Sequence, residues 1–397
     1  MERFPGGIAQ MCSLKIHTII ALVFFWCLPT HAADINAASC SSTDVQNAIN
    51  SASAGDRVIV PTGTCAWSTA VTIPNTKGIT VSGGVATIIS GQLILNPNSS
   101  NGSRITGFTF TSNDAVGTHG SKTTAAFRVD HNIFTGGGTM ISTDGNAPGL
   151  IDHNTFTGNA AAEMIHNLGT GAGDTSGWTD DVTPGGANAL YIEDNTFTYN
   201  ASGNPAYFWG TSAVQAYYGA RTVFRHNTLN MAQVDQHGTC GNVGARWWEI
   251  YENTFYVVLN GNQSNYMAIR DGSGVIFNNH KTGLPNGGAG SIELTDDCTG
   301  TYPDLYQIGR GINQMYSPAY VWGNDSSMSV VSGNPSNVQQ GRDYFLSATQ
   351  PAGLLRQELA SDTSSTTYVY TPYIYPHPLQ GASSAPTPPT GLAIVIH

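Results

Sequence analysis

The six-residue phrase HNIFTG at residues 131–136 returns, with small changes, along much of the chain. Its further copies are HNTFTG at 153–158, DNTFTY at 194–199, HNTLNM at 226–231, ENTFYV at 252–257 and a shortened NNH at 278–280. The Asn of each copy lies 22, 41, 32, 26 and 26 residues after the one before it. Repeats of this length are typical of solenoids, in which each coil packs on its neighbours. The 41-residue gap has room for an intervening coil.

Two apolar columns accompany the Asn column. Three residues before the Asn stand Val129, Ile151, Ile192, Phe224, Ile250 and Ile276. Two residues after it stand Phe134, Phe156, Phe197, Leu229 and Phe255. The runs between them are short, rich in β-branched and aromatic residues and cut by Gly, Asn and Ser, which indicates strands rather than helices. The LxxLxL spacing of leucine-rich repeats is absent, so we expect an all-β solenoid, a single-stranded parallel β-helix.

The Asn column has two expected roles. Asn tolerates the left-handed backbone that a sharp turn between two strands needs. Identical Asn side chains on successive rungs, about 4.8 Å apart, can also form hydrogen bonds along the stack.

The stretch SCSSTDVQNAINSASAGDRVIVPTGTCAW at residues 39–67 predicts a helix followed by a strand and a turn. Val45, Ala48, Ile49 and Ala52 have the spacing of one helical face, and Ser42 or Thr43 can cap its start. We expect this amphipathic helix to cover the first coil, because an open solenoid end exposes apolar surface and strand edges.

This stretch resembles the opening of pectate-lyase-like and polygalacturonase-like domains. Together with the repeats over about residues 103–300, it makes the chain similar to the right-handed parallel β-helices of the pectate-lyase-like superfamily. The resemblance implies an enzyme that acts on polysaccharides. It also implies a substrate groove along one parallel sheet, the one just before the turn into the Asn-bearing strands.

The N-terminal segment predicts export, and the chain divides into five expected parts. KIHTIIALVFFWCLPTHAA at residues 15–33 predicts a signal peptide cleaved near Ala32 or Ala33, so we expect secretion to the periplasm or the medium without stable membrane insertion. The expected parts are a signal peptide (1–33), the cap and first coils (34–102), the β-helix core (103–300), the last coils with an aromatic-rich packing segment (301–380), and a Pro/Ser linker with a terminal strand (381–397).

The net charge limits the classes of binding partner, and the cysteines indicate disulfides. The net charge of −11 argues against nucleic acid, and it means that an acidic polysaccharide needs a local basic patch or a bound cation. Export favours disulfides, and four cysteines beyond the leader allow three pairings. We expect Cys40 with Cys65 and Cys240 with Cys298. Nothing in the sequence indicates oligomerisation, and a monomer is expected.

A strand upstream of each Asn turn carries the candidate site. Aligning MISTDG (140–145), EMIHN (163–167), AYFWG (206–210), VDQHG (234–238), MAIRDG (267–272) and IELTDD (292–297) sends polar neighbours of the buried residues outward. A slip of one residue would reverse this facing. The expected outward stripe suits a sugar chain, with Tyr207, Trp209 and, from an inserted loop, Trp178 as stacking platforms and Glu293 and Arg246 as further substrate-binding residues.

Two mechanisms compete for this stripe. In β-elimination a base removes the proton beside a uronate carboxylate while positive groups stabilise the developing charge. His237 or His166 is the expected base, Asp235 its orienting partner and Arg270 the neutralising group. Inverting hydrolysis instead needs two carboxyl groups about 6.5 to 9.5 Å apart. Its candidates are Asp235, Asp271, Glu293, Asp296 and Asp297.

A second constellation lies two residues before the Asn column. Asp130, Asp152 and Glu193 would stack at rung spacing, where carboxylates repel unless a cation such as Ca²⁺ neutralises them. Pectate lyases of the resembled superfamily hold Ca²⁺ with acidic groups from successive rungs and use a nearby Arg as base. By that resemblance Ca²⁺ is the one cofactor to consider, and Arg225 rivals His237 as base.

The sequence therefore favours a secreted polysaccharide lyase acting on a uronate-containing chain. An inverting hydrolase of the polygalacturonase type remains open, although the NTD, DD, GHG and RIK series of that family is not present in order. A non-catalytic, glycan-binding β-helix is the third hypothesis.

Overall fold

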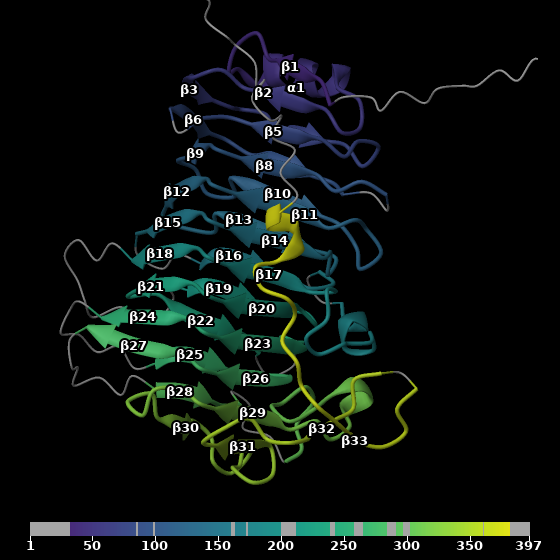
Figure 1. Ribbon diagram of the computed structural model, residues 1–397, viewed down its shortest axis with the longest axis vertical. Helices are drawn as coiled ribbons and strands as arrows, with labels where there is room; N and C mark the ends of the chain where they lie inside the picture. Colours follow the sequence, from purple (N-terminus) through teal and green to yellow (C-terminus); the bar gives the residue numbers. More distant parts are fainter. Residues whose placement is uncertain are drawn as a thin grey trace, which may run out of the picture. The chain divides into compact units, whose positions relative to one another are not determined.

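The protein folds into a parallel β-helix with three long sheets (Figure 1). The computed structural model describes residues 32–84, 86–97, 100–159, 163–171, 174–199, 212–238, 243–257, 265–283, 291–296, 302–359 and 361–381. The predicted signal peptide up to residue 31 and the segment 382–397 lie outside this range. Within the described residues, no helix is long and apolar enough to cross a membrane.

Each complete coil contributes one strand to each sheet, in the order sheet C, sheet A, sheet B, whereas among the described residues the terminal coils lack a strand of one or two sheets. Sheet A consists of β1 (Asp34–Asn36), β2 (Arg57–Ile59), β5 (Thr80–Ser82), β8 (Arg104–Thr106), β11 (Phe127–Asp130), β14 (Gly149–Asp152), β17 (Leu190–Glu193), β20 (Arg221–Arg225), β23 (Trp247–Tyr251), β26 (Ser273–Phe277), β29 (Ala319–Trp322) and β31 (Tyr344–Ser347). Sheet B consists of β3 (Gly63–Ala66), β6 (Thr87–Ser90), β9 (Thr109–Phe110), β12 (Ile133–Gly136), β15 (Thr155–Gly158), β18 (Thr196–Tyr199), β21 (Thr228–Asn230), β24 (Thr254–Val257) and β27 (His280–Gly283). Sheet C consists of β4 (Val71–Ile73), β7 (Leu93–Leu95), β10 (Val116–His119), β13 (Ile141–Asp144), β16 (Glu163–Asn167), β19 (Ser212–Ala216), β22 (Gln233–Gln236), β25 (Asn265–Ile269), β28 (Ser291–Leu294) and β30 (Val330–Ser332).

The remaining elements flank these sheets. They are α1 (Ser42–Ser51), the short helices η1 (Ser176–Trp178), η2 (Ile312–Gln314) and α2 (Pro378–Gly381), and the antiparallel pair β32 (Leu354–Arg356) and β33 (Thr366–Tyr368). Helix α1 buries Val45, Ala48 and Ile49 and packs against β4, β1 and β2. Its N-cap is Ser41, one residue before Ser42 and two before Thr43, the predicted caps, and the Ser41 side chain accepts a hydrogen bond from the Asp44 amide.

The interior is built from the predicted apolar columns. Every residue of both columns is buried, and Phe110, Phe134, Phe156 and Phe197 stack with ring centroids 5.2, 4.9 and 4.7 Å apart. Because β14 pairs directly with β17, the 41-residue gap in the repeat is a loop on one coil and contains no intervening coil.

The Asn column forms a buried ladder at the turn from sheet A to sheet B. Asn154 Nδ2 donates to Asn195 Oδ1 at 3.0 Å, and the same contact repeats from Asn132 to Asn324. The expectation of a left-handed Asn is wrong. The positive φ falls on the residue before it, at His131, His153, Asp194, His226, Glu252 and Asn278. The Asn is therefore selected for its side-chain hydrogen bonds, and its predecessor makes the turn.

The outer face of sheet A is covered by the C-terminal part of the chain. Tyr191, Val223, Tyr251, Phe277 and Trp322 form a second apolar cluster there with Leu354 and Tyr370. Residues 370–381, here called the strap, run along this face in Figure 1 as the yellow segment crossing β23, β20, β17 and β14. From β14 to β23, sheet A therefore has the core on one face and the strap on the other.

The expected disulfide between Cys40 and Cys65 is present and ties the residues before α1 to β3. Cys240 and Cys298 lie outside the described residues.

Candidate active site

Two files of polar side chains cross the middle of sheet C. The first contains His166 of β16, Gln215 of β19 and Asp235 of β22, which occupy paired positions on neighbouring strands. Their strand neighbours Ile165, Val214 and Val234 are buried in the core, so alternation directs the first file away from the core.

The second file begins one residue beyond the strands. Tyr217 follows β19, His237 follows β22 and Arg270 follows β25. The sheet ladder continues through these positions, because the His237 amide donates to Ala216 O at 2.9 Å and the Arg270 amide donates to Gln236 O at 3.0 Å. The continued ladder stacks Tyr217, His237 and Arg270 on successive rungs.

The imidazole of His237 is the centre of the cluster. Arg270 Nη1 lies 3.1 Å and Gln215 Nε2 lies 3.2 Å from His237 Nδ1. Both partners are N–H donors, so the Nδ1 of a neutral imidazole accepts from them. Asp235 Oδ2 lies 3.5 Å from the same nitrogen and 3.6 Å from Arg270 Nη2. The Tyr217 ring packs on the imidazole with centroids 4.2 Å apart.

Several polar atoms of this cluster have no hydrogen-bond partner in the described part of the chain. They are Asp235 Oδ1, Gln215 Oε1 and His166 Nε2, all from the first file. Buried polar groups are normally hydrogen-bonded, and unsatisfied ones concentrate where a ligand or water completes the set. The first file therefore has spare hydrogen-bonding capacity next to the His237 cluster.

Burial and neighbouring charges shift the pKa values of the groups around His237. Burial raises the pKa of Glu163, and the charge of Asp235 raises it further. Burial lowers the pKa of His166, and His237 adds to that effect. Burial raises the pKa of Tyr217, assisted by Glu163 and Asp235, although Arg270 opposes the change. The Tyr217 hydroxyl therefore stays protonated and available as a proton donor.

The structure brings together four of the predicted catalytic residues, namely His237, Arg270, Asp235 and His166. Glu293 lies in the same sheet, one rung beyond Ala268, and accepts a hydrogen bond from Asn265 Nδ2. The alignment expected from the sequence placed Ile269 opposite Val234, but in the structure Ile269 pairs with Gln236. The last two strands of the alignment are therefore shifted by two residues relative to the expected register. A shift of two preserves the facing of a strand, so Arg270 still meets His237.

Two predicted substrate-binding residues are not on this surface. Arg246 is fully buried, forms an ion pair with Glu358 and lies 5.4 Å from the ring of Trp178. Trp178 is 2% exposed, and its Nε1 donates to Gly244 O. Both predictions are wrong in this respect, because the two side chains are buried and pack on each other. Tyr207 and Trp209 lie outside the described residues, and β19 (Ser212–Ala216) fills the place in sheet C assigned to 206–210.

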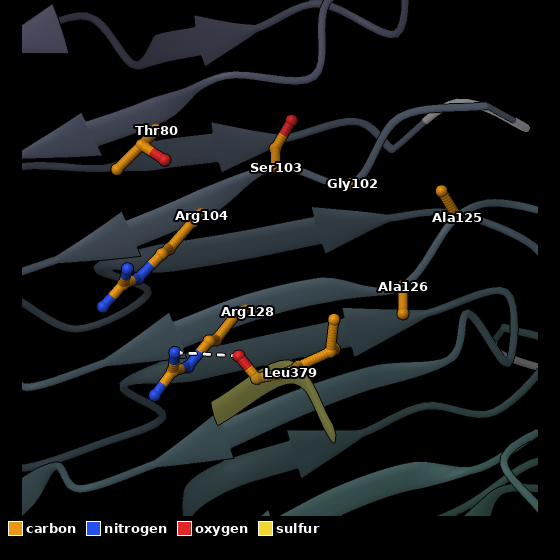
Figure 2. A pocket seen from close by; sticks show the side chains of 8 residues that line it. All are labelled: Thr80, Gly102, Ser103, Arg104, Ala125, Ala126, Arg128 and Leu379. Atoms are coloured by element: carbon orange, nitrogen blue, oxygen red, sulfur yellow. Dashed lines mark hydrogen bonds between the residues drawn. The ribbon is translucent and has the colours of Figure 1, made fainter. Parts of the chain in front are cut away.

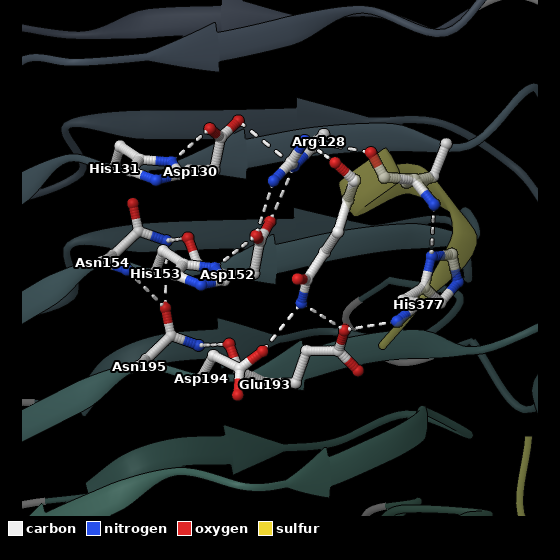
Figure 3. A network of polar contacts seen from close by, with 12 residues as sticks. Arg128, Asp130, His131, Asp152, His153, Asn154, Glu193, Asp194, Asn195 and His377 are labelled. Atoms are coloured by element: carbon white, nitrogen blue, oxygen red, sulfur yellow. Dashed lines mark hydrogen bonds and ion pairs between the residues drawn. The ribbon is translucent and has the colours of Figure 1, made fainter. Parts of the chain in front are cut away.

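The predicted Ca²⁺ column is an ionic ladder on sheet A (Figure 3). Arg104 donates to both oxygens of Asp130 at 2.6 Å, and Arg128 donates to both oxygens of Asp152 at 2.8 and 2.7 Å. Burial alone would raise the pKa of Asp130, but the hydrogen bonds and charges of Arg104 and Arg128 hold it below its usual value. Guanidinium groups thus supply the neutralisation that was assigned to a cation, and these three carboxylates do not fit a Ca²⁺ site. Among the described side chains, no three His, Cys, Asp or Glu residues are arranged to hold a metal ion.

Arg225 belongs to the same ladder. It is fully buried, its Nε donates to Glu193 Oε2 at 2.6 Å, and its other nitrogens donate to Tyr251 Oη and to the strap carbonyls of Tyr373 and Ile374. A base must reach its substrate, so the structure corrects the expectation that Arg225 rivals His237.

A cavity of about 360 Å³ lies on the outer face of sheet A, where the strap ends, beside Arg104, Arg128 and Leu379 (Figure 2). Both guanidinium groups are engaged by Asp130 and Asp152, and Arg128 Nη1 also donates to Leu379 O at 2.9 Å. No His, Cys, Asp, Glu or Lys lines this cavity, and the Ser103 hydroxyl donates to Lys77 O at 3.2 Å, so we place the candidate site on sheet C.

Sequence reasoning missed Gln215, Tyr217 and Glu163. Gln215 and Tyr217 were missed because the preceding aromatic segment imitated a strand of this coil. The alternation in SAVQAYY at residues 212–218, with Ala213 and Val214 before a polar residue, is the signal that could have found them. Glu163 stood in the aligned segment but was not singled out.

Comparisons with known proteins give a fold likeness only. No protein-family model and no curated protein sequence matches the chain. Among solved structures, the PL6 family alginate lyase AlyGC matches with a TM-score of 0.34 and 11% identity, over 84% of this chain and 55% of that one. An arginine-to-alanine mutant of the same enzyme matches with a TM-score of 0.36 and 11% identity, over 80% of this chain and 54% of that one. The chain thus spans little more than half the length of these enzymes.

Proposed function

We propose that the protein is an exported polysaccharide lyase that cleaves a uronate-containing chain by β-elimination on sheet C. The observation that carries this proposal is the contact of His237 with Arg270 and Gln215, with Asp235 and Tyr217 beside it. These groups include a base, two donors for a carboxylate, a partner for the protonated base and an acid.

The contacts of His237 suggest how the reaction begins. A uronate carboxylate is a stronger acceptor than an imidazole nitrogen, so it would take over the N–H donors of Arg270 and Gln215. That exchange frees the lone pair of His237 Nδ1 next to the carbon that bears the acidic proton. His237 then removes this proton, and the electron pair spreads onto the carboxylate, whose charge Arg270 stabilises.

The same neighbours complete the step. The protonated Nδ1 can donate to Asp235 Oδ2, which lies 3.5 Å away in the free protein. The electron pair then forms the new carbon–carbon double bond as the glycosidic carbon–oxygen bond breaks. Tyr217 supplies a proton to the departing oxygen, and the proton held by His237 then leaves to water, which reprotonates Tyr217. We propose that the enzyme acts as a monomer.

The decisive experiment measures the ultraviolet absorbance of the unsaturated product on a panel of acidic and neutral polysaccharides, with and without chelator. His237→Ala and Arg270→Ala should each lower kcat by about 100- to 10,000-fold, and Tyr217→Phe by a similar factor without loss of the ring stack. His153→Ala is the matched control, since His153 Nδ1 contacts Asp152 at 2.8 Å on the other side of the coil. Full activity of His237→Ala would contradict the proposal.

Inverting hydrolysis is the second candidate, favoured by one observation. The pKa of Glu163 is raised by burial and by Asp235, as expected for an acid paired with a base. This reaction would release new reducing ends without ultraviolet absorbance, and Glu163→Gln would abolish it. Binding without any product would instead identify a glycan-binding β-helix.

A further inference from the structure

Sheet C carries an uneven distribution of charge. Among the described strand residues of this sheet and the positions directly after them, Arg270 is the only Arg or Lys. The same positions carry four carboxylates, Asp144, Glu163, Asp235 and Glu293. A single guanidinium on an acidic surface can neutralise one carboxylate of a bound polymer and no more.

The flanking carboxylates lie on both sides of Arg270. Glu163 lies on β16, on the Tyr217 side of the cluster, and its charge interacts with Asp235 and Tyr217. Glu293 lies on β28, the strand next to β25 on the opposite side. Neighbouring rungs are about 4.8 Å apart, close to the length of one sugar unit. A polymer with a carboxylate on every sugar would therefore bring its flanking charges towards Glu163 and Glu293.

The spare hydrogen-bonding atoms of the first file favour sugar hydroxyl groups over a further carboxylate. Asp235 Oδ1 and Gln215 Oε1 are acceptors without a partner among the described residues, and Asp235 is 4% exposed. Sugar hydroxyl groups are donors that such acceptors can bind, whereas a carboxylate offers only acceptors.

We infer that the substrate is a heteropolysaccharide in which each uronate is separated from the next by neutral sugars, and not a continuous polyuronate. This inference rests on the proposed function of the same site. The uronate to be cleaved occupies the position at Arg270 and Gln215, and neutral units lie beside Glu163 and Glu293.

The first test compares affinities by titration calorimetry at low salt. Deacylated gellan and hyaluronan, whose uronates are separated by neutral sugars, are compared with polygalacturonate and alginate. We expect at least one spaced polymer to bind about tenfold more tightly than either polyuronate, and the difference to shrink at high salt. Equal or tighter binding of a polyuronate would overturn the inference. The ultraviolet absorbance of the product is measured separately. Its absence would contradict the proposed lyase reaction, whereas the affinities alone decide between spaced polymers and polyuronates. Failure of all four polymers to bind would overturn both the proposed lyase function and the inference about its substrate.

The second test removes the flanking charges. Glu163→Gln and Glu293→Gln, alone and together, should strengthen polygalacturonate binding by up to about tenfold and leave the spaced polymer within about twofold. Glu252→Gln is the matched control, because it removes the same charge at the turn beside His226, away from sheet C. An equal gain in the control variant, or none in the double variant, would overturn the inference. Circular dichroism and thermal unfolding verify that each variant folds.

Discussion

At the scale of single residues, the Asn ladder explains why one short phrase recurs. Each Asn uses its amide fully: Asn227 Nδ2 donates to Ile192 O, Arg225 O and Asn253 Oδ1, while its Oδ1 accepts from Asn195. The side chain is 1% exposed, so water cannot replace these bonds. The repeat is thus a requirement for hydrogen bonding in a closed environment.

We predict that Asn227→Ala lowers the free energy of unfolding by about 3 kcal/mol, because it leaves buried carbonyl and amide groups unpaired. Urea denaturation followed by circular dichroism measures this loss. The exposed Asn188→Ala serves as a control and should change stability by less than about 0.5 kcal/mol. Equal stability of both variants would contradict the ladder's role.

At the scale of elements, the strap connects the charged ladder of sheet A to the end of the chain. The His377 amide donates to Glu193 Oε1 at 2.8 Å, and its ring packs on Tyr191 and Tyr373. Burial and the charges of Arg225 and Arg128 lower the pKa of His377 to about 4. Its Nδ1 accepts from the Leu379 amide at 3.2 Å, which requires an unprotonated nitrogen.

The depressed pKa of His377 predicts acid sensitivity. Its contribution to stability is complete above pH 6.5, the unfolded value, and is lost as the pH falls towards about 4. The loss amounts to at most about 3 kcal/mol. His377→Asn retains an acceptor but does not titrate, so its free energy of unfolding should depend less on pH in this window. His280→Asn, at an exposed site, should retain the wild-type slope. Parallel curves for the wild type and His377→Asn would contradict the prediction.

At the scale of the whole molecule, each coil depends mainly on its neighbours. The disulfide between Cys40 and Cys65 closes a separation of 25 residues at the N-terminal end, remote from β19, β22 and β25 in the order of sheet C. We predict that Cys40→Ser with Cys65→Ser lowers stability by about 3 kcal/mol without changing kcat at temperatures where the protein is folded. Thermal unfolding and the ultraviolet assay measure the two effects. A proportionate loss of kcat would indicate coupling along the β-helix.

The sequence predicted the β-helix because its signal is repeated. Phe156 or Ile192 alone would be ambiguous, but a column of such residues at one period defines an interior. The position of His237 beside Arg270 followed from alternation within strands, which survives a register error of two residues. The role of Asp130, Asp152 and Glu193 did not follow, because Arg104 and Arg128 were not assigned to them and the covering strap is distant in sequence. Tyr217 was missed because the aromatic segment at 206–210 was assigned to the strand of this coil, although the alternation that identifies β19 lies in the next segment, 212–218.

The stacking of Tyr217, His237 and Arg270 on three successive coils has an evolutionary consequence. Duplication or loss of an entire coil before Tyr217 or after Arg270 would lengthen or shorten the binding surface while leaving the trio in place. The same event between Tyr217 and Arg270 would separate the trio by a full turn of chain. Related sequences should therefore vary in coil number on either side of this segment and keep the 54 positions from 217 to 270 free of inserted repeats.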